Sequence, residues 1–73
     1  MSMTEEEKIA HRKKIGGMIA EIRKSKGLTQ EDLAVMVSFD RTNIAKIENG
    51  KYSVGVDILG KICKALGVEL KIE

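Results

Sequence analysis

The sequence predicts an all-α fold, a compact bundle of four or five helices that ends in a short β-strand. Apolar residues recur with helical spacing in successive segments that glycines separate, and the chain contains no proline. Residues 68–73 instead alternate apolar and polar side chains, which is typical of a strand. A chain of 73 residues is long enough for one domain. We therefore expect a single domain over residues 1–73, with its core at about 15–67 and the strand at 68–73.

The first helix is expected over residues 4–26. Thr4, followed three residues later by Glu7, has the pattern of a capping box. Two adjacent glycines, Gly16 and Gly17, each weaken a helix by about 1 kcal/mol relative to alanine. They indicate either close packing against a neighbouring element or fraying of the first part of the helix. The apolar residues around them have the spacing i, i+3, i+4, i+7, which predicts one inward stripe: Ile15, Met18, Ile19 and Ile22.

Three shorter helices are expected after Gly27. The second covers residues 30–37 behind an N-cap at Thr29, and the third covers 41–49 behind an N-cap at Asp40. The fourth covers residues 56–66 and ends at a glycine. Their apolar positions predict a core made of Leu33, Ala34, Val37, Ile44, Ile47, Ile58, Leu59, Ile62 and Leu66.

The composition argues against several classes of function. No apolar run approaches the roughly 18 residues of a membrane span. The only cysteine, Cys63, and the only histidine, His11, lie far apart in sequence, so we expect no disulfide, no metal site and no cofactor. The same residues suggest no nucleophile–base pair, and we expect no enzymatic activity. A lone cysteine suits a reducing cytoplasm, which is the expected location.

The charge of the chain does not by itself indicate a partner. The net charge is only +2, although residues 8–26 carry seven Lys or Arg against one Glu. Such a run is most simply a solvated helix face. Whether Arg12, Lys13 and Lys14 contact a nucleic acid stays open from the sequence.

Two short helices joined by a tight turn indicate helix-turn-helix geometry, although this spacing also fits any small helical bundle. Residues 28–34 read Leu-Thr-Gln-Glu-Asp-Leu-Ala, and residues 44–51 read Ile-Ala-Lys-Ile-Glu-Asn-Gly-Lys. Over roughly residues 15–70 the chain resembles the lambda-repressor-like family, the Cro and phage-repressor type of DNA-binding domain. The resemblance implies binding to double-stranded DNA with the third helix in the major groove. A fifth helix is usual in that family, and the terminal strand stands in its place here.

The resemblance also assigns roles to individual residues. Base reading would fall to the outward side chains of the third helix, Arg41, Thr42, Asn43 and Lys46. Phosphate contacts would come from Thr29, Gln30, Asn49 and Lys51. Arg23 and Glu48 correspond to a buried ion pair that orients the third helix.

Two departures from the family pattern affect the turns. Ser38 occupies a turn position where the family prefers glycine, and a non-glycine residue with positive φ is mildly strained. The loop before the fourth helix has Val54 and Gly55 where a proline is usual.

The terminal strand has no partner strand within the chain, and an unpaired strand invites a second copy. Two antiparallel copies related by an axis at Leu70 would place Glu69 opposite Lys71 and Val68 opposite Ile72. The sequence thus predicts a homodimer joined by the strand Val68, Glu69, Leu70, Lys71 and Ile72. A disordered tail and a strand folded back on its own helices are the alternatives.

Together these features favour a dimeric transcriptional regulator, a repressor that reads an inverted repeat in double-stranded DNA. One alternative is an antitoxin that binds a toxin partner and represses its own operon. Another is a controller of a restriction–modification or mobile-element locus.

Overall fold

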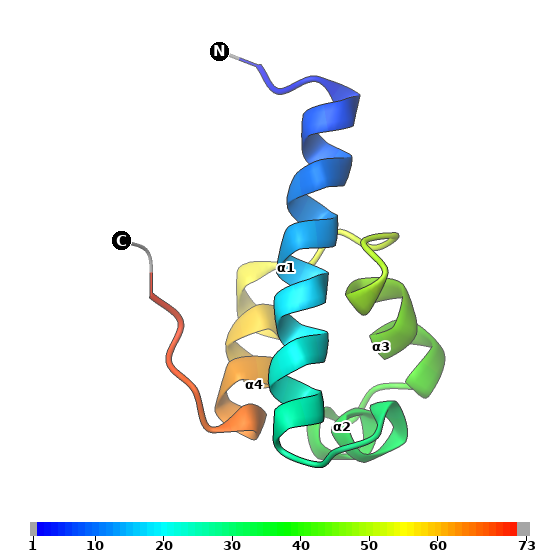
Figure 1. Cartoon of the computed structure of the whole chain (residues 1–73), viewed down its shortest axis with the longest axis vertical. Coiled ribbons are helices and arrows are strands. Elements are labelled where there is room, and N and C mark those ends of the chain that lie inside the picture. The colour runs from blue at the N-terminus through cyan, green and yellow to red at the C-terminus, as the bar shows by residue number, and fades with distance from the viewer. Residues whose placement is uncertain (1, 72–73) are drawn as a thin grey trace.

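The computed structural model of the protein describes residues 2–71, and all regular secondary structure in this part of the chain is α-helix (Figure 1). The element order is α1 (Glu5–Ser25), α2 (Gln30–Val37), α3 (Arg41–Glu48) and α4 (Val56–Leu66). Each helix agrees with its predicted range to within a residue at either end. α1 continues through both of its adjacent glycines, and a Cβ at Gly16 would meet backbone atoms of α3, so of the two alternatives the structure favours close packing.

Local side-chain chemistry explains where α1 and α2 begin. The Thr4 hydroxyl accepts a hydrogen bond from the Glu7 N–H at 3.1 Å, and the Glu7 carboxylate accepts one from the Thr4 N–H at 2.8 Å. Thr29 and Asp32 repeat this capping box at the start of α2, at 3.0 and 2.8 Å. The backbone N–H bonds from Thr4 and Thr29 lower the pKa of Glu7 and Asp32 below their usual values. Their contribution to stability is therefore present above the usual carboxyl pKa and is lost as the pH falls through the lowered one.

The start of α3 differs from the prediction. Asp40 lies at the N-cap position with extended backbone angles, but its side chain makes no capping hydrogen bond. The first turn of α3 therefore keeps free N–H groups on the surface.

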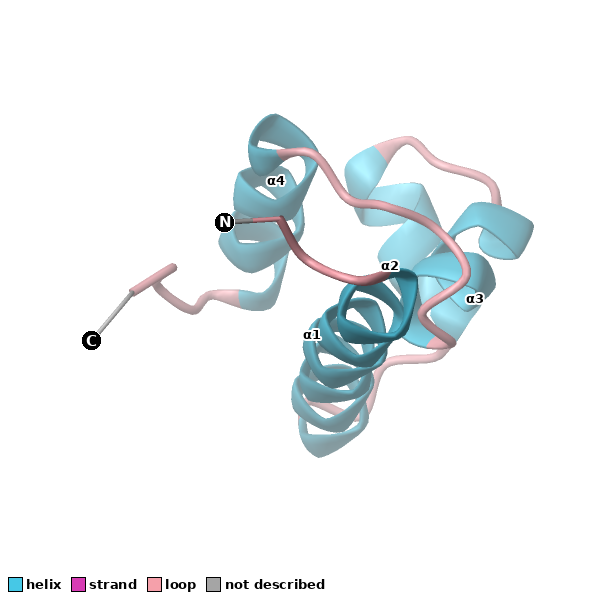
Figure 2. Ribbon diagram, turned by 90° about the horizontal axis from the view of Figure 1, so that it is seen from above, coloured by secondary structure: helices cyan, strands magenta, loops and turns pink. Residues whose placement is uncertain are grey.

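The core lies where α2 packs against α3 and α4, and α1 covers α3 (Figure 2). The buried apolar side chains are Ile19, Leu33, Ala34, Val37, Ile44, Ile47, Ile62 and Leu66. Ile58 and Leu59 are only partly buried against this cluster, as is Phe39 from the α2–α3 turn. The core-facing positions predicted for α2 and α3 are thus all buried.

The apolar stripe of α1 is only partly buried. Ile19 is in the core, but Ile15 and Met18 are 41% and 53% exposed. α1 packs mainly on α3 and makes few contacts with α4. The apolar sides of α1 and α4 instead line a hollow of about 450 Å³, together with residues 69–71 of the tail.

The predicted C-terminal strand is not supported over the residues that the structure describes, and its pairing with a second copy stays a prediction. Residues 68–71 have no strand conformation, while Ile72 lies outside the described residues. The Val68 N–H donates to the Cys63 carbonyl at 3.0 Å and so closes the end of α4. Within the same tail, the Lys71 Nζ lies 3.6 Å from the Glu69 Oε2 and forms an ion pair with it. Alternating side chains form a strand only where a neighbouring strand takes up the backbone hydrogen bonds, and no segment of the described chain does so.

The turn between α2 and α3 carries the one non-glycine residue with positive φ among residues 2–71. Ser38 has φ 58° and ψ 43°, and its N–H donates to the Val35 carbonyl at 3.3 Å. We expect Ser38→Gly to raise the free energy of unfolding by about 0.5 kcal/mol, because the left-handed strain exceeds the added flexibility of glycine in the unfolded chain. Urea denaturation measures the change. Ser53→Gly, at an exposed loop position, is the control and should give no gain. A loss of stability in Ser38→Gly would contradict the prediction.

Candidate nucleic-acid interface

A buried ion pair joins α1 to α3. The Arg23 Nε donates to Glu48 Oε2 at 2.7 Å, and Arg23 Nη2 donates to Glu48 Oε1 at 3.0 Å. The two residues are only 6% and 8% exposed. The third donor, Nη1, bonds the Leu28 carbonyl at 2.7 Å and so ties down the α1–α2 loop. The hydrogen bond with Glu48 raises the pKa of Arg23 above its usual value.

The ion pair is connected to the surface of α3 through Gln30. Its amide Nε2 donates to Glu48 Oε1 at 3.1 Å, and its Oε1 accepts from Arg41 Nη1 at 3.4 Å. The side chain for which a phosphate contact was predicted therefore bridges the buried Glu48 and the exposed Arg41. Sequence spacing offers no signal for this bridge, because Gln30 lies on α2 and its two partners lie on α3, 11 and 18 positions along the chain.

α3 presents a polar face on the side opposite the core. Ile44, Ile47 and Glu48 are buried, which defines its inward side. With about 3.6 residues per turn, Thr42 and Lys46 then lie at the centre of the outward side. Arg41 and Asn43 lie on its two flanks. Arg41, Thr42 and Lys46 are exposed, and Asn43 is partly buried.

The remaining candidate residues lie at two helix ends. Thr29 is exposed at the start of α2, although its hydroxyl and N–H are both engaged with Asp32. Asn49 and Lys51 are exposed just after α3, on either side of Gly50, whose φ is +73°. The Lys51 N–H donates to the Lys46 carbonyl at 2.9 Å, which holds this segment against the helix. The candidates thus occupy the start of α2, the outer face of α3 and the segment that follows it.

This surface matches the chemistry of duplex DNA. Arg and Lys can donate to guanine O6 and N7, and a threonine methyl can contact the methyl group of thymine. Exposed lysines and helix N-terminal N–H groups bind phosphates. Among residues 2–71 no group of three or more His, Cys, Asp or Glu side chains could hold a metal ion. No helix in this described part combines the length and the apolar character that a membrane crossing requires.

Comparison with known proteins finds helix-turn-helix proteins, in agreement with the arrangement of α2 and α3. A family model described as helix-turn-helix matches residues 19–72. An uncharacterized HTH-type transcriptional regulator of Methanothermobacter thermautotrophicus is 44% identical over 52 residues, which cover 71% of this chain and 75% of that protein.

Two solved structures of controller proteins have a similar fold. The restriction-modification controller protein C.AhdI of Aeromonas hydrophila superposes with a TM-score of 0.80 at 35% identity, covering 82% of this chain and 91% of that one. The controller protein C.Esp1396I, solved as a tetramer in complex with its natural 35 base-pair operator, has a TM-score of 0.73 at 40% identity. The match covers 78% of this chain and 75% of that one.

Other relatives are longer than this chain. The endothelial differentiation-related factor 1 proteins of Danio rerio and Homo sapiens are 36% and 40% identical, and the matched regions cover 48% and 38% of their length. This chain thus spans half or less of those relatives.

Proposed function

Because this chain belongs to the helix-turn-helix family, we propose that it is a transcriptional regulator that binds double-stranded DNA sequence-specifically through the outward face of α3. The observation that carries the proposal is the polar face centred on Thr42 and Lys46, which the buried Arg23–Glu48 pair holds in a defined orientation. Base reading in the major groove requires a rigid element that presents a small set of polar side chains in fixed positions.

Arg41 is the residue that we assign to the most selective contact. Its guanidinium offers parallel donors that fit the O6 and N7 of one guanine, and Gln30 orients it in the free protein. Lys46 and Thr42 read neighbouring base pairs, with Asn43 at the edge of the face. Asn49, Lys51, Thr29 and the first N–H groups of α2 hold phosphates on either side. The amide of Gln30 must exchange one of its internal bonds if it also contacts a phosphate.

A homodimer is the form in which we expect the protein to bind. A module of this size contacts only one half-site, and two-fold symmetric readers place two such modules about one helical turn apart. The operator complex of the similar controller protein, which is a tetramer, supports an oligomeric reader.

A controller of a restriction–modification locus is the more specific function that one observation favours. The match to C.AhdI covers 91% of that controller, so the similarity extends over nearly its whole chain. We expect the protein to repress transcription, because a protein bound across a promoter blocks access of the transcription machinery to it.

Selection of binding sites from a random duplex pool tests the function. We expect enrichment of an inverted repeat with half-site centres about 10 base pairs apart. Arg41→Ala should bind the selected site roughly 5- to 150-fold more weakly and lose the preference at one base pair of each half-site. Lys61→Ala, exposed on α4, is the control and should leave the affinity unchanged. Salt-sensitive binding without any enriched motif would contradict the proposal.

A further inference from the structure

The N-terminal half of α1 extends beyond the rest of the helical bundle, past the end of α3 (Figure 1). It carries three consecutive basic residues, Arg12, Lys13 and Lys14. Sequence alone treats them as one run. The structure places them in three different surroundings.

Lys13 lies directly against the segment that follows α3. A Cβ added to the buried Gly50 would be 2.7 Å from the Lys13 N, 2.8 Å from its Cα and 2.6 Å from its Cγ. The two backbones are therefore in contact. Asn49 and Lys51, the candidate phosphate contacts at this end of α3, are the immediate neighbours of Gly50.

The charge of Lys13 is available for a ligand. Its side chain is exposed, and no ion pair with a carboxylate forms at Lys13 within the described part of the chain. A lysine stem is long and flexible enough to carry its ammonium out past the loop. Lys13, Lys46 and Lys51 thus contribute three positive charges around one end of α3.

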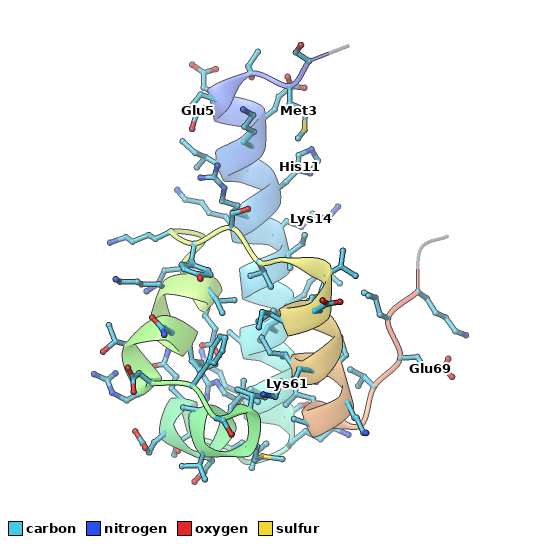
Figure 3. The ribbon with its side chains drawn as sticks, turned by 180° about the vertical axis from the view of Figure 1, so that it is seen from behind. Met3, Glu5, His11, Lys14, Lys61 and Glu69 are labelled. Carbon is cyan, nitrogen blue, oxygen red and sulfur yellow. The ribbon has the colours of Figure 1, made fainter. Side chains whose placement is uncertain are left out.

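Its two neighbours are placed differently. Arg12 approaches Glu5, with Nη2 at 4.0 Å from Oε1, and lines a hollow with Tyr52 and Ser53. Lys14, about 100° further around the helix, points away from α3 on the same side as His11 (Figure 3).

We propose that Lys13 binds a DNA phosphate beside those held by Asn49 and Lys51, and that Lys14 lies outside the interface. The inference rests on the proposed function, because it extends the same surface by one contact on α1. Gly16, three residues after Lys13, helps to fix where Lys13 lies. It lets the α1 backbone rest on the Ile47 and Glu48 carbonyls and so sets the position of α1 along α3.

The test compares the salt dependence of binding for the wild-type chain, Lys13→Ala and Lys14→Ala. Each protein is titrated with its selected duplex and with an unrelated duplex over a range of salt concentrations. Each lost phosphate contact reduces the slope of log affinity against log salt by about 0.9. We expect that reduction for Lys13→Ala on both duplexes, a restored slope for Lys13→Arg and an unchanged slope for Lys14→Ala.

Two other outcomes have distinct meanings. Lys13 also lies near the C-terminal carbonyls of α3, where a cation stabilises a helix without any DNA. A Lys13→Ala protein with a lower melting temperature and an unchanged slope would overturn the inference in favour of that role. A wild type without sequence preference would overturn the proposed function, while the slopes on the unrelated duplex would still decide whether Lys13 contacts phosphate.

Discussion

Replacing Arg23 with methionine should lower the free energy of unfolding by about 3–5 kcal/mol. The change removes three donated hydrogen bonds and leaves the Glu48 carboxylate, whose side chain is 4% exposed, with only the Gln30 amide as a partner. An uncompensated buried charge is among the most destabilising features that one substitution can create. At roughly 0.05–0.15 kcal/mol per residue, this loss is a large share of the total stability of a chain of this length.

Urea denaturation followed by circular dichroism measures the effect. Lys24→Met, at the exposed neighbouring position on α1, is the matched control and should change the stability by less than about 0.5 kcal/mol. A loss below about 1 kcal/mol for Arg23→Met would mean that Glu48 reaches water or is protonated in the variant.

The double variant Arg23→Met, Glu48→Leu separates stability from orientation. Apolar replacement of a whole buried pair is often neutral or stabilising, so we expect most of the lost stability to return. DNA affinity should stay reduced, because Gln30 loses the Glu48 carboxylate as a partner and no longer links Arg41 to the core. Full recovery of affinity would show that packing alone orients α3.

The two adjacent glycines of α1 should respond to alanine with opposite signs. A Cβ at Gly16 would lie 2.7 Å from the Glu48 carbonyl oxygen and closer still to that of Ile47. These are backbone atoms of α3, which cannot move aside by a change of rotamer. A Cβ at Gly17 would meet no atom within 4 Å. We expect Gly16→Ala to lower the free energy of unfolding by about 1–3 kcal/mol and Gly17→Ala to raise it by about 1 kcal/mol.

The pair of variants controls for helix propensity, because both gain the same preference for the helical backbone. Equal effects in thermal unfolding would mean that α1 does not rest on the end of α3. Gly16→Ala should also weaken binding to the selected duplex, because it displaces α3 relative to α1. Gly17→Ala should leave that affinity unchanged.

Local chemistry made the helices predictable. Thr4 with Glu7 and Thr29 at the next N-cap mark helix starts within four residues of sequence, and Gly67 ends α4 at φ +70°. Helical spacing likewise identified the buried faces of α2 and α3. The motif residues indicated the family, which the comparisons confirm over residues 19–72.

The strand predicted over residues 68–73 shows where a local pattern is insufficient. Its alternation is real, but a strand exists only with a partner at hydrogen-bonding distance, and periodicity carries no information about that partner. The capping role predicted for Asp40 is a second case in which the local pattern is insufficient. Its position and backbone angles suit the role, yet the side chain makes no bond to the first turn of α3.

The sequence by itself determined the helices, most of the core and the residue types on the outward face of α3, because each depends on neighbours within a turn or two. The tertiary structure alone decided that Gly16 and not Gly17 touches α3, that Gln30 bridges Glu48 and Arg41, and that Lys13 lies beside Gly50. These are contacts between residues 11 to 37 positions apart. They depend on how the helices pack as bodies, and that packing is set by the whole core rather than by any one segment.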